Sequence, residues 1–126
     1  NPGLLDKKIN LMAVDNIQVL DIIEVMEAFL ERKHPPEHIR PKLDIGYKIE
    51  DQSIIIHEIR PFWNDPSKII YPEVAKATYV KARNHWKVFW LRANLKWYPY
   101  DPKPTVKTLS DFVKLVEEDK HACFWG

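Results

Sequence analysis

Residues 43–50 alternate apolar and polar side chains without a break, and no other feature constrains the fold as strongly. Successive side chains of a strand point to opposite faces of a sheet, so this alternation predicts a half-buried strand. The segment "SIIIHEIR", residues 53–60, follows a turn at residues 51–52 and predicts a second strand. The two strands are expected to pair antiparallel, as neighbours joined by a short turn do.

The faces of these two strands depend on the register that the turn sets. If Ile49 lies opposite Ile55, one face of the pair gathers three ionic side chains: Asp44, Glu58 and Arg60. A slip of one residue moves every side chain of a strand to the other face, so this grouping is a prediction about the turn as well.

Residues 86–98, "WKVFWLRANLKWY", are the longest alternating segment and predict the longest strand, which Pro99 ends. The more apolar set is expected to face the core: Phe89, Leu91, Ala93, Leu95 and Trp97. The opposite set places rings beside cations: Trp86, Val88, Trp90, Arg92, Asn94, Lys96 and Tyr98. Residues 74–82 fit either a helix begun by Pro72 or a strand, and the β-branched and aromatic side chains there favour a strand.

Helical periodicity appears at both ends of the chain. Residues 16–33 place apolar side chains at helical spacing and acidic ones elsewhere, with Asp15 as the expected cap. Residues 108–120 predict a second amphipathic helix with Thr108 as its cap. The tail "HACFWG" is unusually apolar for a chain end, so it is expected to pack onto the sheet or a partner.

These elements predict one α+β domain over residues 15–126, preceded by an N-terminal arm over residues 1–14. Its expected order is an N-terminal helix, an antiparallel meander sheet of three or four strands, and a C-terminal helix. With 126 residues, of which 45% are hydrophobic and 29% charged, the chain can bury a core without help from a metal or a disulfide.

Composition argues against several classes of protein. The chain has only three glycines, whereas the phosphate-binding loops of nucleotide enzymes depend on glycine. Cys123 is the only cysteine, so neither an intramolecular disulfide nor a multi-cysteine zinc site can form. The longest apolar runs are about four residues, against about 20 for a membrane span. The start of the chain does not read as a secretory signal, and a cytoplasmic location is expected.

Five strings together carry a family resemblance: "PPEHIRPKLDIGY", "HEIRPFW", "AKATYV", "LRANLKWYPY" and "ACFWG". They resemble a group of small bacterial proteins known as domain of unknown function three thousand and twenty-four. The resemblance extends over roughly residues 25–126. That family has no assigned chemistry, so the resemblance implies membership and no particular activity.

One enzymatic hypothesis rests on Asp44, Glu58 and Arg60. The pattern resembles a metal-dependent nuclease hairpin, in which an Asp and a Glu-x-Lys follow a helix bearing an acidic residue. Carboxylates there hold Mg²⁺, which positions the scissile phosphate and activates water. Glu31 or a neighbouring glutamate could supply the helical carboxylate. Arg60 departs from the pattern because a guanidinium stays protonated, and a cross-strand ion pair with Asp44 is the alternative. No other pattern requires a cofactor.

A binding hypothesis rests on the distribution of charge. Residues 74–107 contain eight basic side chains and one acidic one, a net charge of +7 in a chain of net charge +1. Rings that stack on bases beside cations that meet phosphates are how sheet surfaces hold single-stranded nucleic acid. The predicted binding residues are those of one face of the long strand: Trp86, Trp90, Arg92, Lys96 and Tyr98.

Two alternatives remain for that aromatic face. A helix could cover it, with Arg and Lys stems packed over the rings as cation–π pairs, or it could form the interface of a homodimer. The sequence favours a binding or interaction module over an enzyme, with the partner left open.

The remaining histidines and the cysteine predict no site. Prolines between His34 and His38 prevent the regular helix that would bring both rings to one metal. His121 and Cys123 lie two residues apart near the chain end, without an evident third catalytic group. A structural role for Cys123 is the favoured interpretation.

Overall fold

A computed structural model describes residues 16–126; the expected cap at Asp15 and the arm over residues 1–14 lie outside the described residues. The described elements are, in order, α2 (Asn16–Lys33), β1 (Asp44–Glu50), β2 (Ser53–Phe62), β3 (Asp65–Ile70), β4 (Glu73–Val80), the 3₁₀ turn η1 (Lys81–Arg83), β5 (His85–Leu91), β6 (Trp97–Pro99), β7 (Thr105–Val106) and α3 (Leu109–Glu118). All strand pairs are antiparallel.

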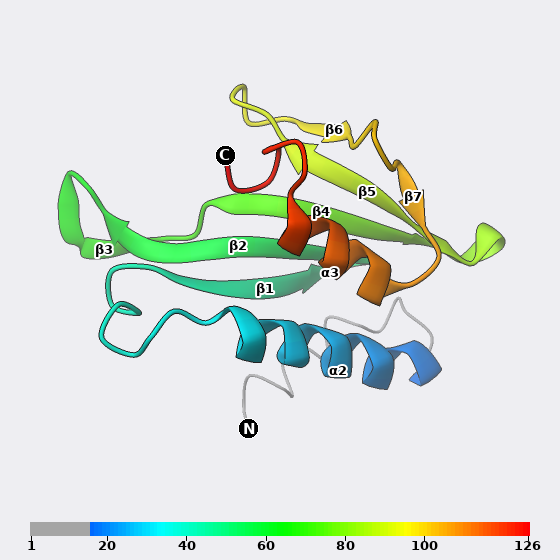
Figure 1. Cartoon of the computed structure of the whole chain (residues 1–126), viewed down its shortest axis with the longest axis horizontal. Helices are drawn as coiled ribbons and strands as arrows, with labels where there is room; N and C mark the ends of the chain where they lie inside the picture. Colours follow the sequence, from blue (N-terminus) through cyan, green and yellow to red (C-terminus); the bar gives the residue numbers. More distant parts are fainter. Residues whose placement is uncertain (1–15) are drawn as a thin grey trace.

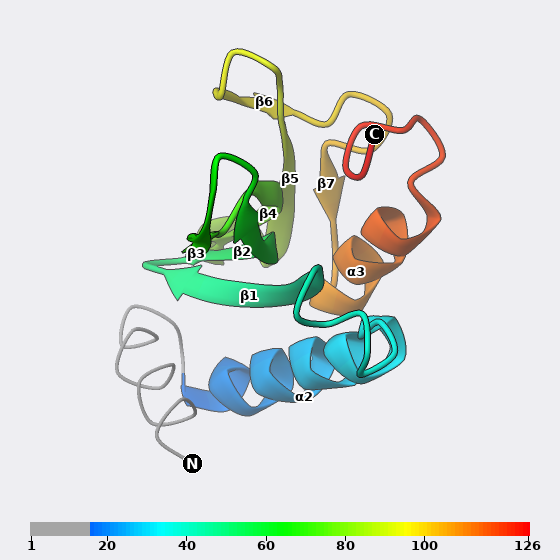
Figure 2. The same ribbon diagram turned by 90° about the vertical axis from the view of Figure 1, so that its left-hand side faces the viewer.

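The sheet has the strand order β1-β2-β4-β5-β6, with β3 added beside β2 and β7 beside β5 (Figure 1). In Figure 2 the sheet is strongly twisted, α2 lies beneath β1, and α3 lies beside β5 and β7. The α+β class is confirmed. Neither α2 nor α3 has the length and apolar character of a membrane-crossing helix.

The expectation of three or four strands is wrong, because the described chain forms a seven-stranded sheet. Residues 65–70, for which no strand was predicted, form β3, where Pro66 occupies a strand that pairs on one side only. Residues 86–98 form two strands rather than one. Leu95 adopts a left-handed conformation, with φ 62°, and its N–H donates to the carbonyl of Arg92, which closes a hairpin between β5 and β6. Residues 74–80 lie in β4, as expected.

The turn between β1 and β2 is one residue tighter than expected. Ile49 pairs with Ile54, and Glu50 pairs with Ser53, so only two residues form the turn. Asp51 makes this possible with a left-handed φ of 52°, a conformation that aspartate tolerates better than most residues. Compared with the expected register, this shift of one residue turns every side chain of β2 to the opposite face relative to β1.

One face of the sheet, the covered face, packs against the helices. Its buried side chains include Ile45, Tyr47, Ile54, Ile56 and Val88, which form one core with Ile22, Met26, Phe29, Phe112 and Val116 of the helices. The open face is the opposite side and includes Lys48, Ile55, Lys76, Phe89 and Trp97. Within residues 16–126 no helix packs on it.

The C-terminal elements agree with the sequence prediction. Thr108 caps α3, because its Oγ1 accepts a hydrogen bond from the backbone N–H of Asp111 at 3.1 Å. The tail is docked: Phe124 is buried against the ring of Tyr100, 4.8 Å between centroids. The Asp119 carboxylate accepts hydrogen bonds from the backbone N–H groups of Phe124 and Trp125 at 3.0 and 2.9 Å.

Candidate basic cleft

The predicted ionic trio does not form. Asp44 pairs with Ile59 and Glu58 pairs with Ile45, so Asp44 and Glu58 lie on opposite faces of the β1–β2 ribbon. Glu58 instead lies 3.6 Å from Arg60. The grouping was wrong because it depended on the register of one turn, and the tighter turn reversed it.

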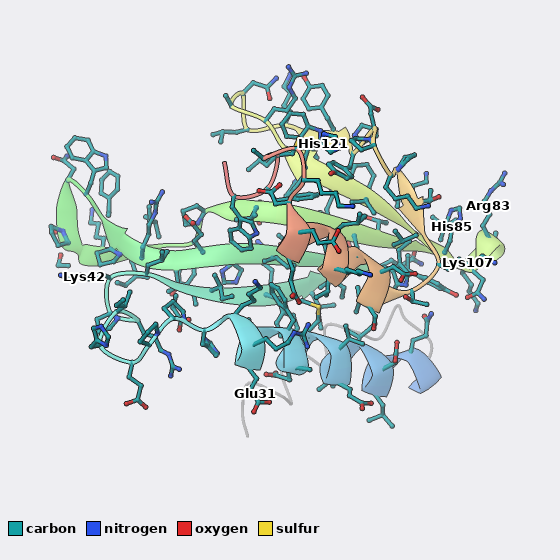
Figure 3. All side chains as sticks on the ribbon, in the orientation of Figure 1. Glu31, Lys42, Arg83, His85, Lys107 and His121 are labelled. Carbon is teal, nitrogen blue, oxygen red and sulfur yellow. The ribbon has the colours of Figure 1, made fainter. Side chains whose placement is uncertain are left out.

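The predicted metal ligands are likewise separated. Asp44 accepts hydrogen bonds from its neighbour Ile45 at 2.8 Å and lies 2.6 Å from the Nδ1 atom of His34. Glu31 is exposed on α2 and projects away from the sheet (Figure 3). No group of three or more potential metal ligands converges within residues 16–126. The nuclease-like arrangement of Asp44, Glu58 and Glu31 therefore has no geometric basis.

The predicted aromatic face of β5 is turned inward. Trp86 is buried in the core, only 4% exposed, and Trp90 packs against the same core. The residues expected to be hidden, Phe89 and Trp97, lie on the open face instead. The prediction was wrong because both faces of β5 carry large apolar side chains, so alternation could not tell which face points inward.

The outer end of β5 nevertheless holds three of the predicted residues together. Trp90 and Tyr98 pair across β5 and β6, and the Arg92 guanidinium lies over both rings, 5.5 and 4.7 Å from their centroids. Lys96 is exposed in the adjoining turn. This is the cation–π packing expected as an alternative, and it holds a guanidinium at the surface between two rings.

A cleft of about 1040 Å³ lies between α3 and the edge strand β7 and is here called the basic cleft. The turn η1 and the start of β5 close one end of it. Its lining contains five cationic side chains: Arg83, Lys103, Lys107, Lys114 and Lys120. Only two acidic side chains, Asp111 and Glu118, share the lining. Figure 3 shows Arg83, His85 and Lys107 at one end of the molecule, with Lys42 at the other.

Most of these cations lack a counterion. Lys120 lies 3.5 Å from Glu118, whereas Arg83, Lys103 and Lys107 have no carboxylate oxygen within 4.0 Å among residues 16–126. Lys114 also borders a groove of about 470 Å³ that contains Asp21 and Glu24 of α2. The positive potential is therefore concentrated at the β7 side of the basic cleft.

Two further features favour an anion in the basic cleft. The first turn of α3, which carries the positive end of the helix dipole, lines it through Thr108, and the Asp111 carboxylate of the same turn offsets part of that charge. His85 also lines the cleft, and its Nε2 atom is buried without a hydrogen-bond partner in the described chain. A buried ring nitrogen without a partner is uncommon in native proteins and can be satisfied by a bound ligand or water.

The basic cleft was not predicted as a site from the sequence, although the excess of basic residues that contributes to it was recognised. Arg83, Lys103 and Lys107 belong to the basic segment of residues 74–107, but their side chains come together only when β7 returns beside β5. Lys114 and Lys120 lie outside that segment altogether. Proximity between these two groups was therefore not readable from the charge pattern.

The thiol and the last histidine form no catalytic pair. The Cys123 Sγ atom lies 3.6 Å from the backbone carbonyl oxygen of His121, not from its ring. Burial, with a smaller effect of the nearby Asp119 charge, raises the pKa of the Cys123 thiol. Since the thiolate is the nucleophile, a raised pKa makes this cysteine less reactive.

Comparison with known proteins identifies a family without assigning an activity. The model of one family, described as Domain of unknown function (DUF3024), matches residues 14–126. No curated protein and no solved structure matches the chain. The match covers nearly the whole chain, and the protein is a member of this domain-of-unknown-function family.

Proposed function

We propose that this protein is a binding module for single-stranded nucleic acid, with phosphates held in the basic cleft. The observation that carries the proposal is a set of three cations, Arg83, Lys103 and Lys107, that share one large hollow and have no counterion among residues 16–126. Neutralising phosphates with Lys and Arg releases counterions, and this supplies most of the affinity of sequence-independent binding.

The proposed binding surface extends along β5, from one end of the strand to the other. His85, the first residue of β5, lines the basic cleft, and Trp90 lies near the other end beside Arg92 and Tyr98. Seven strand residues span roughly 20 Å. A short single strand could therefore meet phosphate-binding cations at one end of β5 and a guanidinium between two rings at the other.

The charge of the whole chain supports the same orientation. Residues 81–107, which form η1 and β5 to β7, carry seven basic side chains against one acidic one. Helix α2 carries four acidic side chains against two basic ones. Such a separation steers a polyanion toward the β5–β7 side of the molecule. A cytoplasmic location belongs to the same proposal, since the single Cys123 excludes an intramolecular disulfide.

The test is a titration of a fluorescein-labelled single-stranded oligothymidylate, and of the matching RNA, by fluorescence anisotropy. Affinity should fall steeply between about 50 and about 200 mM salt. Replacing Lys103 and Lys107 by Ala should weaken binding and reduce the slope of log affinity against log salt by about 1.4, or about 0.7 for each lost contact.

Sedimentation of the free protein, compared with its mass of 15.0 kDa, shows whether a homodimer forms instead.

The matched control is Lys33→Ala with Lys42→Ala, which removes the same charge from the end of α2 and the loop after it. Both side chains are exposed, and Lys42 lies at the opposite end of the molecule from the cleft in Figure 3. Equal weakening by the two double variants would show a general charge effect and reject the cleft. Absence of binding at low salt would reject the function.

A further inference from the structure

The turn between β5 and β6 has a leucine at a position that usually holds glycine. The backbone N–H of Leu95 donates to the carbonyl of Arg92 at 2.8 Å, and the N–H of Arg92 donates to the carbonyl of Lys96 at 3.1 Å. Leu95, the last residue of this β-turn, has φ 62°. In hairpins of this kind the left-handed residue is usually glycine, because glycine has no Cβ atom to clash. A bulky side chain in this conformation is an outlier.

Packing does not explain the leucine either. The Leu95 side chain is 79% exposed, so it contributes little apolar burial to the fold. A strained residue that stabilises nothing nearby is costly, and such residues are concentrated at ligand-binding and catalytic sites. Leu95 therefore indicates a contact with a molecule outside this chain.

The neighbouring side chains hold this turn in place. Asn94 Oδ1 accepts a hydrogen bond from the backbone N–H of Lys96 at 3.0 Å, and Asn94 Nδ2 donates to the Tyr98 hydroxyl at 2.9 Å. The Arg92 guanidinium lies over the Tyr98 ring, 4.7 Å from its centroid. The turn lies on the side of the sheet opposite α2 (Figure 1). Because the turn is already ordered, little conformational entropy is lost when Leu95 contacts a ligand.

The surroundings of Leu95 favour a nucleic-acid strand over an apolar protein surface. Leu95 is the only large apolar side chain of residues 92–96, so the turn lacks the contiguous apolar patch of a protein interface. Arg92 and Lys96 have no carboxylate oxygen within 4.0 Å among the described residues. Nucleic-acid-binding proteins insert single apolar side chains, leucine among them, between neighbouring bases, with basic side chains nearby.

We propose that Leu95 inserts between two neighbouring bases of a bound single strand, while Arg92 and Lys96 contact the adjoining phosphates. This inference rests on the proposed nucleic-acid binding and assigns a base contact to the end of β5 that lies away from the basic cleft. Burial of the exposed leucine side chain offsets the cost of separating the two bases.

The test uses a single-stranded oligodeoxyadenylate in which 2-aminopurine replaces several adenines. The fluorescence of 2-aminopurine is quenched by stacking on neighbouring bases, so insertion of Leu95 should raise its emission saturably as the full chain is added. Anisotropy of a labelled copy of the same strand measures affinity separately. Salt-dependent binding without a rise in emission would overturn the insertion and leave the proposed function standing. Absence of binding at low salt would reject both.

Two variants at the same position separate the apolar side chain from the backbone strain. Leu95→Asn removes the apolar surface and introduces a residue that tolerates the left-handed conformation. Its urea midpoint should be equal or higher, yet it should bind about threefold to tenfold more weakly and lose the rise in emission. Leu95→Met keeps an apolar side chain and should retain both affinity and emission.

The matched control is Leu20→Gln on α2, because Leu20 is also exposed, at 69%, and lies outside the proposed surface. It should leave affinity and emission unchanged. Equal losses in Leu20→Gln and Leu95→Asn would overturn the proposal. So would a folded Leu95→Asn variant that binds as tightly, and with the same emission, as the unmodified chain.

Discussion

The two faces of the sheet come from the same alternating strands but are filled in different ways. On the covered face, Ile54, Ile56 and Val88 are fully buried beneath the helices. On the open face, the Lys48 ammonium pairs with Glu50 and Glu73 at 3.0 and 2.8 Å. The Lys76 ammonium lies over the rings of Phe89 and Trp97, and Trp97 is only half-buried. The covered face derives its stability from apolar burial, whereas the open face balances ion pairs and cation–π contacts against desolvation.

The largest expected difference in stability is between removing an aromatic ring from the core and removing one from the open face. Phe112 of α3 is 0% exposed in the core beneath the covered face, and Phe112→Ala should lower the free energy of unfolding by about 3–5 kcal/mol. Trp97→Ala on the open face should lower it by only about 1 kcal/mol, because the ring is already partly solvated. Urea denaturation of both variants measures the difference. Equal losses would mean that the open face belongs to the core.

A smaller effect tests how tightly the open face is packed where β1 meets β2. A Cβ atom added at Gly46 would lie 2.9 Å from Cε1 of His57 and 3.2 Å from Cδ1 of Ile59. Gly46→Ala should therefore lower the free energy of unfolding by about 1–3 kcal/mol through overpacking.

The His57→Ala background provides the control, because it removes the nearer of the two contacts. Gly46→Ala should be less destabilising there, and a double-mutant cycle measures the coupling. The same loss in both backgrounds would show that His57 does not restrict this position.

The smallest expected effects concern the two lysines of the open face, whose contributions to stability should depend on pH in different ways. Lys48→Met should lower the free energy of unfolding by about 0.2–1 kcal/mol at neutral pH, as expected for a partly exposed ion pair. Hydrogen bonds to Glu73 and then Glu50 raise the pKa of Lys48 above 10.5, so its stabilisation is present below pH 10.5 and is lost as pH rises through the higher folded value.

The charged side chain of Lys76 is expected to change the stability of the fold in the opposite direction. Partial burial lowers its pKa from 10.5, so its ammonium destabilises the fold at neutral pH, and this destabilisation disappears between the folded pKa and pH 10.5. Lys76→Met should be neutral or slightly stabilising at neutral pH and should lose that advantage as pH approaches 10.5. Urea midpoints across this range measure both variants. A change of the same sign for both would contradict the assigned surroundings.

Much of the local structure could be read from residue patterns. The buried stripe of α3 consists of Leu109, Phe112, Val113 and Val116, as helical spacing predicts, and Thr108 caps the helix. The apolar tail docks, as its composition indicates. These features depend on contacts within a few residues or on periodicity, both of which a sequence displays directly.

The sites were harder to predict, because each depends on a single geometric decision. The left-handed Asp51 shortened one turn and thereby separated Asp44 from Glu58. The turn at Leu95 folded one predicted strand into a hairpin and placed Trp97 opposite Leu91. In both places a backbone conformation of one residue changed which side chains meet.

The sequence by itself therefore determined the two helices, the strands that contain residues 44–50, 53–60 and 74–80, the helix cap and the excess of cations toward the C-terminal half. Only the tertiary structure decided which face of β5 points inward, where those cations gather beside α3, and which lysine of the open face keeps a counterion. The physical reason is that the alternation of side chains shows which residues share a face of a strand but does not show which of the two faces is buried. The side that becomes buried is set by the register of turns and by the helices that pack against the sheet, and these relations join residues far apart in the chain.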